Sequence, residues 1–227
     1  MMSMGYQFFE KAVEEPSAAM RMVWVATHNA SQYYLVKGRT AKPFNAMLGE
    51  TYELVTPNFK LVTEAVCHHP PIVSMNCEGK GWTLNKSVQT NIKFTGKQVQ
   101  IEDIFPIELD LFPESLNGQK ESYVIQTPKL VIGNLMIGER FIEPYDTVTI
   151  KNQTSGEYCE MTFKQRSGGW RKEVQAEMVS AKVFDKNGSE LFQIERRYTD
   201  KLVAKDLRKQ GEEIVLFEAP PMPPRHK

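Results

Sequence analysis

Two motifs organise this sequence: Lys42-Pro43-Phe44-Asn45-Ala46-Met47-Leu48-Gly49-Glu50 and, after a short predicted hairpin, Glu64-Ala65-Val66-Cys67-His68-His69-Pro70-Pro71. Both prolines of the second motif lack a backbone donor, and Pro70 restricts His69 to extended geometry. Such a segment cannot lie in the middle of a β-ladder. We therefore expect it where a strand reaches the rim of a sheet, with two imidazoles beside a stiff backbone.

Length and composition limit the class of protein around these motifs. The chain has 227 residues, of which 41% are hydrophobic, and all-β barrels often use this length for one domain. We expect a single domain over residues 1–227. The 28 basic and 28 acidic residues cancel, so no overall field attracts nucleic acid, and any anion site must be local.

Cysteine usage and hydropathy indicate the compartment. The three cysteines, Cys67, Cys77 and Cys159, are odd in number and form no CxxC pair, which suits reduced thiols in the cytoplasm. No apolar run approaches the ~20 residues needed to cross a bilayer, and the N-terminus lacks the apolar core of a signal peptide. We expect a soluble cytoplasmic protein.

Helical periodicity is confined to the first forty residues. The sequence up to Glu15 is weakly helical and ends at Pro16. From Ala18 to Val36 an apolar stripe recurs every three or four residues, which predicts a helix ending before Gly38. The stripe consists of Ala19, Met22, Val23, Ala26 and Ala30. His28 lies in this helix, and a packing or surface contact is the simpler expectation for it.

Beyond Gly49, short β-rich runs alternate with turn residues about every ten positions. The predicted strands cover Thr51–Val55, Lys60–Val66, Ile72–Cys77, Trp82–Val88, Ile92–Thr95, Val99–Ile104, Ile107–Leu111, Tyr123–Thr127, Lys129–Gly138, Thr147–Lys151, Tyr158–Phe163, Glu173–Phe184 and Leu191–Thr199. Asn187-Gly188, between the last two, is a strong hairpin signal. The expected fold class is mainly β: a large antiparallel β-barrel with N-terminal helices, which can enclose a cavity for an apolar ligand.

The two motifs together supply groups that can bind an anion. Lys42 offers an ammonium, Asn45 a side-chain amide, and His68 and His69 two imidazoles. A phosphate presents several strong acceptor oxygens and favours protonated imidazoles beside it. The alternative, from the residues alone, is a solvated Lys42 and histidines that only end a strand.

Metal binding and catalysis are weaker interpretations of the same residues. Cys67, His68 and His69 are consecutive, so in extended backbone they point to alternate faces, and no HExxH or CxxC partner accompanies them. A nucleophilic Cys67 would need a base and an orienting group, and the sequence has no GxSxG elbow. We expect no metal, no cofactor, no catalytic residue and no enzyme. A hydrolase with His68 or His69 as base is the least favoured alternative.

The first motif resembles the KPFNPLLGE signature, and the second the EQVSHHPP signature, of the oxysterol-binding-protein-related lipid-transfer domain family. Ile137-Gly138-Glu139, the strand Thr147-Val148-Thr149-Ile150 and the proline run after Ala219 support the resemblance. The resemblance implies a β-barrel tunnel that shields one lipid, with phosphatidylinositol 4-phosphate at its mouth and, in many members, a sterol in exchange. The headgroup-binding residues that it implies are Lys42, Phe44, Asn45, His68 and His69.

Departures from the signatures bear on ligand choice more than on fold. Ala46, Ala65 and Cys67 replace proline, glutamine and serine, and Arg196-Arg197-Tyr198 stands where Gly-Lys-Trp is common. A sterol and phosphatidylserine therefore both stay open as further ligands. The family's domain commonly starts with a lid segment and continues past the proline run into a helix with further basic ligands. We expect neither part within these 227 residues.

Two functions from different classes follow. The first is lipid transfer between membranes, since an apolar tunnel with a polar mouth extracts a lipid by burying its tails at ~0.8 kcal/mol per methylene. The second is a phosphoinositide sensor or tether that binds the headgroup and moves no lipid. Either function has the membrane surface as a partner and implies a cytoplasmic protein, peripheral at organelle membranes or contact sites.

Overall fold

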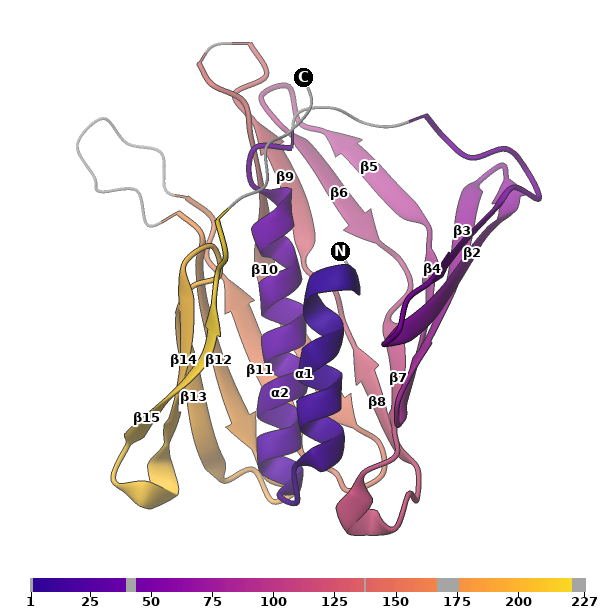
Figure 1. Cartoon of the computed structure of the whole chain (residues 1–227). Coiled ribbons are helices and arrows are strands. Elements are labelled where there is room, and N and C mark those ends of the chain that lie inside the picture. Colours follow the sequence, from indigo (N-terminus) through magenta and orange to yellow (C-terminus); the bar gives the residue numbers. More distant parts are fainter. Residues whose placement is uncertain (1, 40–43, 137, 167–175, 222–227) are drawn as a thin grey trace.

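The computed structural model describes residues 2–39, 44–136, 138–166 and 176–221. Two helices lie against the concave side of a strongly curved antiparallel sheet (Figure 1). They are α1 (Met2–Glu14) and α2 (Ala18–Ser31), and the short 3₁₀ helix η1 (Gln32–Val36) continues α2. The expected class, mainly antiparallel β with N-terminal helices, is confirmed.

Helix α2 begins where the sequence predicts. Ser17 caps it, because its Oγ accepts a hydrogen bond from the Met20 amide at 3.4 Å. Its apolar stripe faces the core, and Met22 and Ala26 are fully buried. His28 is buried as well: its Nδ1 lies 3.0 Å from the Gly5 carbonyl oxygen of α1, and burial lowers its pKa to about 4. His28 therefore joins the two helices, as the packing interpretation predicts.

The main sheet follows the order β1-β2-β3-β4-β7-β8-β10-β11-β12-β13-β14-β15. Its strands are β1 (Thr51–Val55), β2 (Phe59–His68), β3 (Pro71–Gly79), β4 (Trp82–Val88), β7 (Ile107–Leu111), β8 (Glu121–Ile125), β10 (Phe141–Asn152), β11 (Tyr158–Phe163), β12 (Met178–Phe184), β13 (Glu190–Arg197), β14 (Lys201–Asp206) and β15 (Glu212–Glu218). All neighbours on this path pair antiparallel. Neighbours on this path also follow one another in the chain, except for β4 with β7 and β8 with β10, where the strands of a branch intervene.

Three strands leave this path and form a branch. β5 (Thr90–Phe94) pairs with β6 (Val99–Asp103), and β6 pairs with β9 (Lys129–Gly133). β9 in turn pairs with residues 141–145 of β10, whereas residues 146–151 of the same strand pair with β11. The long strand β10 therefore belongs to both the branch and the main sheet.

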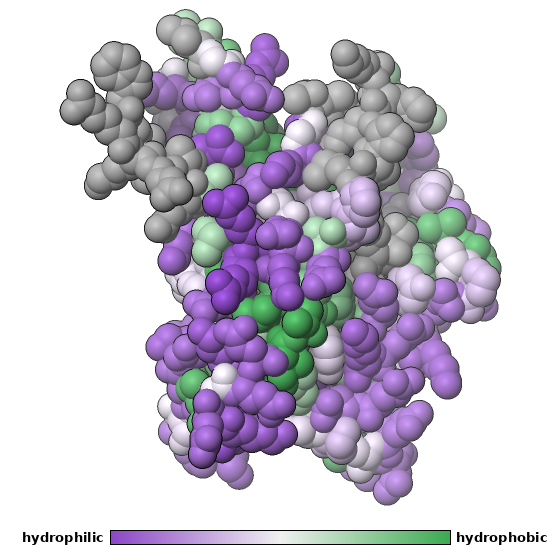
Figure 2. All heavy atoms as spheres, turned by 60° about the vertical axis from the view of Figure 1, so that its left-hand side comes forward, coloured by the Kyte–Doolittle hydropathy of each residue, from purple (hydrophilic) through white to green (hydrophobic). Residues whose placement is uncertain are grey.

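The sheet does not close, contrary to the barrel that the sequence led us to expect. In the described part of the chain the two ends of the path, β1 and β15, pair only with β2 and β14. Helix α2 contacts β11, β12, β13 and β15, and α1 contacts β4 and β7. The helices thus cover the concave face, so the sheet buries apolar surface without joining its edges. On the side where β14 and β15 lie, hydrophobic side chains form a strip among hydrophilic ones (Figure 2).

Most predicted strands are present with ends shifted by a few residues. The Asn187-Gly188 hairpin is confirmed, since Asp185 Oδ1 accepts hydrogen bonds from the Asn187 and Ser189 amides, both at 2.8 Å. The predicted strand from Lys129 ends early, at Gly133. The strand predicted from Glu173 is described from Met178 onward, and residues 173–175 lie outside the described part.

Candidate functional site

The two sequence motifs meet at the edge of the main sheet formed by β1 and β2. The Gly49 amide donates to the Ala65 carbonyl at 2.8 Å, and the Ala65 amide donates to the Glu50 carbonyl at 3.0 Å. The Met47 amide donates to Glu50 Oε2 at 2.7 Å, which orders the end of the first motif. These bonds fix the first motif to β2 only three residues before His68.

The predicted headgroup residues are exposed where the structure describes them. Phe44 has a fully accessible side chain and Asn45 is exposed, whereas Lys42 lies outside the described residues. His68 ends β2 and Pro71 begins β3, so the histidine pair stands at the tip of the β2–β3 hairpin, as predicted for a rim position. The structure thus brings both motifs to one edge, and among the described residues no side-chain hydrogen bond or ion pair joins them.

The two imidazoles pack against each other. Their ring centroids are 4.5 Å apart and the rings are inclined by 62° in an edge-to-face arrangement. Both side chains are exposed. Among the described residues no protein group forms a hydrogen bond or an ion pair with either ring. Their nitrogens are therefore available to a ligand that approaches the hairpin tip.

A β-bulge decides the direction of His68. Ala65 pairs with Val73, Cys67 with Ile72 and His68 with Pro71, so one extra residue is absorbed after Ala65. Paired residues share a face of the sheet and neighbours along a strand alternate, so His68 lies on the face of Ala65. Strict alternation without the bulge would place Cys67 on that face instead. The bulge thus turns one imidazole toward the concave side of the sheet.

An internal cavity of about 320 Å³ opens on this concave side. It lies between the C-terminal part of the helical segment and strands β3 to β9, and most of its wall is apolar. Its lining residues are His28, Gln32, Tyr33, Val36, Met75, Leu84, Lys86, Val88, Thr90, Ile101, Asp103, Ile107, Thr127, Pro128 and Leu130. Volume and lining are those of a site for an apolar ligand with a few polar groups.

One ion pair interrupts the apolar wall. Lys86 Nζ lies 2.7 Å from Asp103 Oδ2, and both side chains are largely buried. The second carboxylate oxygen, Oδ1, is buried without a hydrogen-bond partner among the described groups. Burial raises the pKa of Tyr33, and the nearby Asp103 charge raises it further, so its phenol stays protonated as a donor. The cavity therefore has one polar region in otherwise apolar surroundings.

Sequence reasoning missed these cavity residues. Gln32 and Tyr33 belong to the predicted helix, but their direction depends on how η1 packs. Lys86 lies between Asn85 and Ser87, so no hydropathy signal marks it as inward-facing. Alternation from the buried Leu84 in the same strand would have placed Lys86 on the inner face. That argument requires knowing in advance that Leu84 is buried, and hydropathy alone does not distinguish Leu84 from other apolar residues of the strand.

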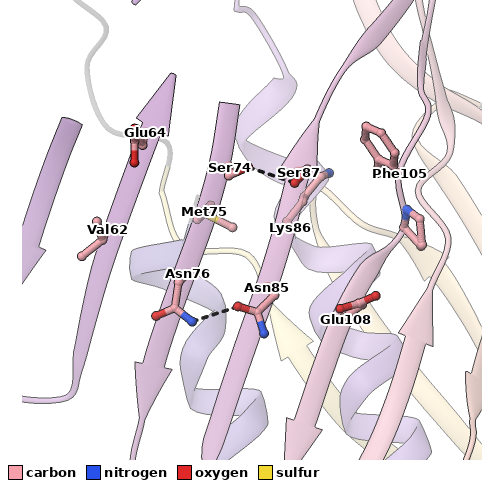
Figure 3. Close-up of a pocket in the computed structure, with 11 residues that line it drawn as sticks. Val62, Glu64, Ser74, Met75, Asn76, Asn85, Lys86, Ser87, Phe105 and Glu108 are labelled. Atoms are coloured by element: carbon pink, nitrogen blue, oxygen red, sulfur yellow. Dashed lines mark hydrogen bonds between the residues drawn. The ribbon is translucent and has the colours of Figure 1, made fainter. Parts of the chain in front are cut away.

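The opposite face of the same wall carries a different pocket, a groove of about 400 Å³ (Figure 3). Its floor consists of two cross-strand pairs, Ser74 with Ser87 at 3.0 Å and Asn76 with Asn85 at 2.9 Å. Its sides are lined by Val62, Glu64, Phe105, Pro106 and Glu108. Lys86 also lines the groove, but its ammonium is paired with Asp103, so the carboxylates of Glu64 and Glu108 repel an anion there. The concave side is therefore the better candidate for a phosphate-bearing lipid.

Two searches over the described residues bear on other functions. No group of three or more His, Cys, Asp or Glu side chains in that part of the chain is arranged to hold a metal ion. No described helix is both long enough and apolar enough to cross a membrane. Of the cysteines, Cys77 and Cys159 are buried, and burial raises the pKa of Cys77 to about 11. The thiol of Cys77 therefore stays protonated at neutral pH.

Comparison with known proteins identifies relatives of the whole chain. A family model described as oxysterol-binding protein matches residues 3–225. Human oxysterol-binding protein-related protein 2 is 35% identical over 190 residues, which make up 82% of this chain and 38% of that protein. The chain thus spans less than half the length of this relative.

Solved structures share the fold. The Osh1 ORD domain in complex with ergosterol matches with a TM-score of 0.83 at 27% identity, over 93% of this chain and 50% of that chain. The Osh3 ORD of Saccharomyces cerevisiae in complex with PI(4)P matches with a TM-score of 0.78 at 22% identity, over 96% of this chain and 57% of that chain. At 22% identity the second match is evidence of a shared fold only. The matched chains are about twice as long as the part that this chain covers.

Proposed function

This chain belongs to the oxysterol-binding protein family, and from that premise we propose that residues 1–227 form a single domain that holds one lipid and transfers it between membranes. The observation that carries the proposal is the 320 Å³ apolar cavity beside the β2–β3 hairpin. The lipid's tails or rings enter the cavity, and its headgroup stays at the hairpin tip. No covalent step is needed for this function.

The cavity supplies the free energy of extraction. Each methylene moved from water into an apolar wall contributes about 0.8 kcal/mol. A lipid leaving a bilayer gives up an equivalent apolar environment, so the cavity must replace that environment closely. Leu84, Ile101 and Leu130 provide such a wall on three different strands. The cavity therefore supports a carrier of one lipid molecule.

The headgroup site is proposed at Lys42, Phe44, Asn45, His68 and His69. His68 and His69 have free ring nitrogens at the tip, and the bulge turns His68 to the face of the sheet that also lines the cavity. A phosphate there would receive charge-assisted hydrogen bonds, each shorter and stronger than a neutral one. We propose phosphatidylinositol 4-phosphate as this ligand, in keeping with the PI(4)P complex of the Osh3 ORD.

A second ligand is proposed for the polar region of the cavity. The Osh1 ORD domain, similar in fold and 27% identical, was solved with ergosterol. A sterol has one hydroxyl group, and the Tyr33 phenol and the Gln32 amide lie in the cavity wall to meet such a group. Phosphatidylserine is the competing second ligand, since its headgroup would use the hairpin tip instead.

A sensor or tether that binds the headgroup without moving lipid is the second candidate. The observation in its favour is the open sheet, because β1 and β15 are unpaired along their outer edges in the described part of the chain. A cavity with an open side shields an apolar ligand from water less completely. On either proposal the protein works at the cytoplasmic surface of organelle membranes.

The test is native mass spectrometry after incubation with liposomes, using two matched variants. Ile101→Trp fills the cavity, whereas Glu102→Trp adds the same side chain at an exposed neighbour outside its lining. We expect a bound lipid in the wild type and in Glu102→Trp, and its loss in Ile101→Trp. If the wild type carries no lipid but still binds liposomes that contain phosphatidylinositol 4-phosphate, the sensor function is favoured. Equal lipid in both variants would place the lipid elsewhere.

A further inference from the structure

The hairpin of β5 and β6 carries apolar side chains that the core does not use. All five residues of β5 are exposed. Ile92 and Phe94 are 64% and 67% exposed, far more than a packed side chain of either type. Ile92 pairs with Ile101 and Phe94 pairs with Val99. Because paired residues share a face, these four side chains form one strip along the hairpin.

This strip continues the wall of the lipid cavity. Ile101 lines the cavity, and its pair Ile92 lies one strand further out on the same face. Phe94 comes next toward the turn at residues 95–98. An apolar path therefore leads from the cavity to the end of the molecule, where a lipid would have to enter or leave.

A second apolar tip lies beside the first. Val99 of β6 pairs with Ile132 of β9, so the turn after β5 and the loop after β9 emerge at the same end of the branch (Figure 1). Met136 in that loop is 87% exposed. Two connections that are distant in sequence therefore lie at one end of the branch, and the second of them exposes Met136.

Basic residues accompany the strip. Lys93, on the opposite face of β5 from Ile92 and Phe94, and Lys97, in the turn, are both exposed. Among the described residues, the ion pairs of this branch join Lys129 to Glu102 and Asp146, and Lys86 to Asp103, and involve neither of these two lysines. Glu139 and Arg140, in the loop after β9, offset each other in charge. The two tips thus combine exposed apolar side chains with an excess of free ammonium groups.

We propose that the strip of Ile92 and Phe94, with Met136 beside it, enters the interface of an anionic bilayer while Lys93 and Lys97 contact lipid phosphates. Apolar side chains at loop tips gain by leaving water for the acyl boundary, and long lysine stems let the charge reach the headgroups. Charge complementarity and continuity with the lipid cavity select a bilayer over a protein partner. The inference rests on the proposed lipid transfer, because it specifies where the carrier meets its donor membrane.

The first test measures sedimentation with vesicles of phosphatidylcholine and phosphatidylserine. The double variant Ile92→Glu/Phe94→Glu should bind on the order of tenfold more weakly than the wild type, because two carboxylates replace the apolar anchors. Leu207→Glu is the control: this exposed apolar residue lies in the connection between β14 and β15, which Figure 1 shows at the opposite end of the molecule. It should bind like the wild type. Equal binding by the double variant and the control would overturn the proposal.

A second test reports on depth of insertion. Phe94→Trp should be quenched by brominated phosphatidylcholine in these vesicles, beyond the quenching of the native tryptophans measured in the wild type. No additional quenching would show that the tip stays in water. If instead the wild type is a dimer by light scattering and Ile92→Glu/Phe94→Glu is a monomer, the strip contacts a second copy and the bilayer proposal fails.

Failure of this inference can be told from failure of the proposed function. A fluorescent sterol delivered on cyclodextrin requires no membrane, so Ile92→Glu/Phe94→Glu should load it like the wild type while failing to extract it from vesicles. A wild type that binds vesicles through the tip but takes no lipid from either source would retain the docking surface and remove the carrier function.

Discussion

His68 and His69 form an exposed pair whose rings contact mainly each other. Replacing both by alanine should therefore leave the fold intact and weaken phosphoinositide extraction. Charge-assisted hydrogen bonds contribute roughly 1.5–3 kcal/mol each, so losing two should weaken binding by on the order of a hundredfold or more. Extraction of labelled phosphatidylinositol 4-phosphate from liposomes measures the loss.

The control for this pair is Lys60→Ala, an exposed basic residue on the same strand but eight residues before His68. It should extract lipid like the wild type, and circular dichroism should show both proteins folded. If the folded double variant extracted lipid normally, the histidines would have no part in lipid binding and would only end a strand.

His28 makes stability depend on pH. Burial lowers its pKa to about 4 from the ordinary 6.5, so the unfolded chain binds this proton more tightly. The contribution of His28 to the free energy of unfolding is therefore fully present above pH 6.5. It falls as the pH decreases toward 4, by up to about 3 kcal/mol for this shift. In His28→Gln the change in unfolding free energy between pH 7 and pH 5 should shrink. Urea denaturation at both values checks this, and an unchanged difference would assign the pH effect to other groups.

Single residues also show where sequence reasoning ends. The prolines after His69 were enough to predict a strand end, because they lack donors. The direction of His68 was not predictable, since it depends on a bulge whose extra residue has no sequence signal of its own. Lys86 and Asp103 lie far apart in sequence and meet only because β4 and β6 converge at the cavity.

At the scale of elements, a buried ion pair joins the helices to the sheet. Arg21 of α2 and Glu121 of β8 meet at 2.7 Å, with Asn152 of β10 and Tyr123 as further donors to the carboxylate. Burial alone would raise the pKa of Glu121, but the hydrogen bonds from Arg21 and Asn152 lower it overall. The carboxylate is therefore charged and fully partnered.

Removing one partner of this pair should be costly. Arg21→Met leaves a buried charge uncompensated and should lower the free energy of unfolding by about 3–5 kcal/mol. Arg21→Met/Glu121→Leu should recover part of that loss, since it removes both charges. Urea denaturation of the single and double variants gives the comparison. An equal loss in both would show that packing, not charge, determines the effect.

Most elements followed from periodicity, and the misses have physical reasons. β14 and β15 were not predicted, because charged residues at both ends leave only three or four apolar positions in each strand. The open sheet was not predicted either, since the sequence shows strands but not that helices cover their concave side. Tertiary packing decides both cases.

At the scale of the whole molecule, 28 basic and 28 acidic residues leave no net field. Selection among anionic lipids must then come from local groups. Lipid extraction should favour phosphatidylinositol 4-phosphate over phosphatidylserine in liposomes of equal surface charge. Mass spectrometry of the loaded protein measures the ratio. If the two lipids were extracted in proportion to their abundance in the liposomes, the site would recognise negative charge and not the headgroup.

The double membership of β10 has a kinetic consequence. Residues 141–145 pair with β9 in the branch, whereas residues 146–152 pair with β11 and β8 in the main sheet. The branch ends at β5, whose residues are all exposed, so we expect its ladders to open by local fluctuation, while core strands open only with global unfolding. Amide hydrogens in the first half of this one strand should therefore exchange with deuterium faster than those in the second. Bending of the branch at a membrane would therefore reshape the cavity, which Thr90, Ile101 and Leu130 of the branch line, while the main sheet stays folded.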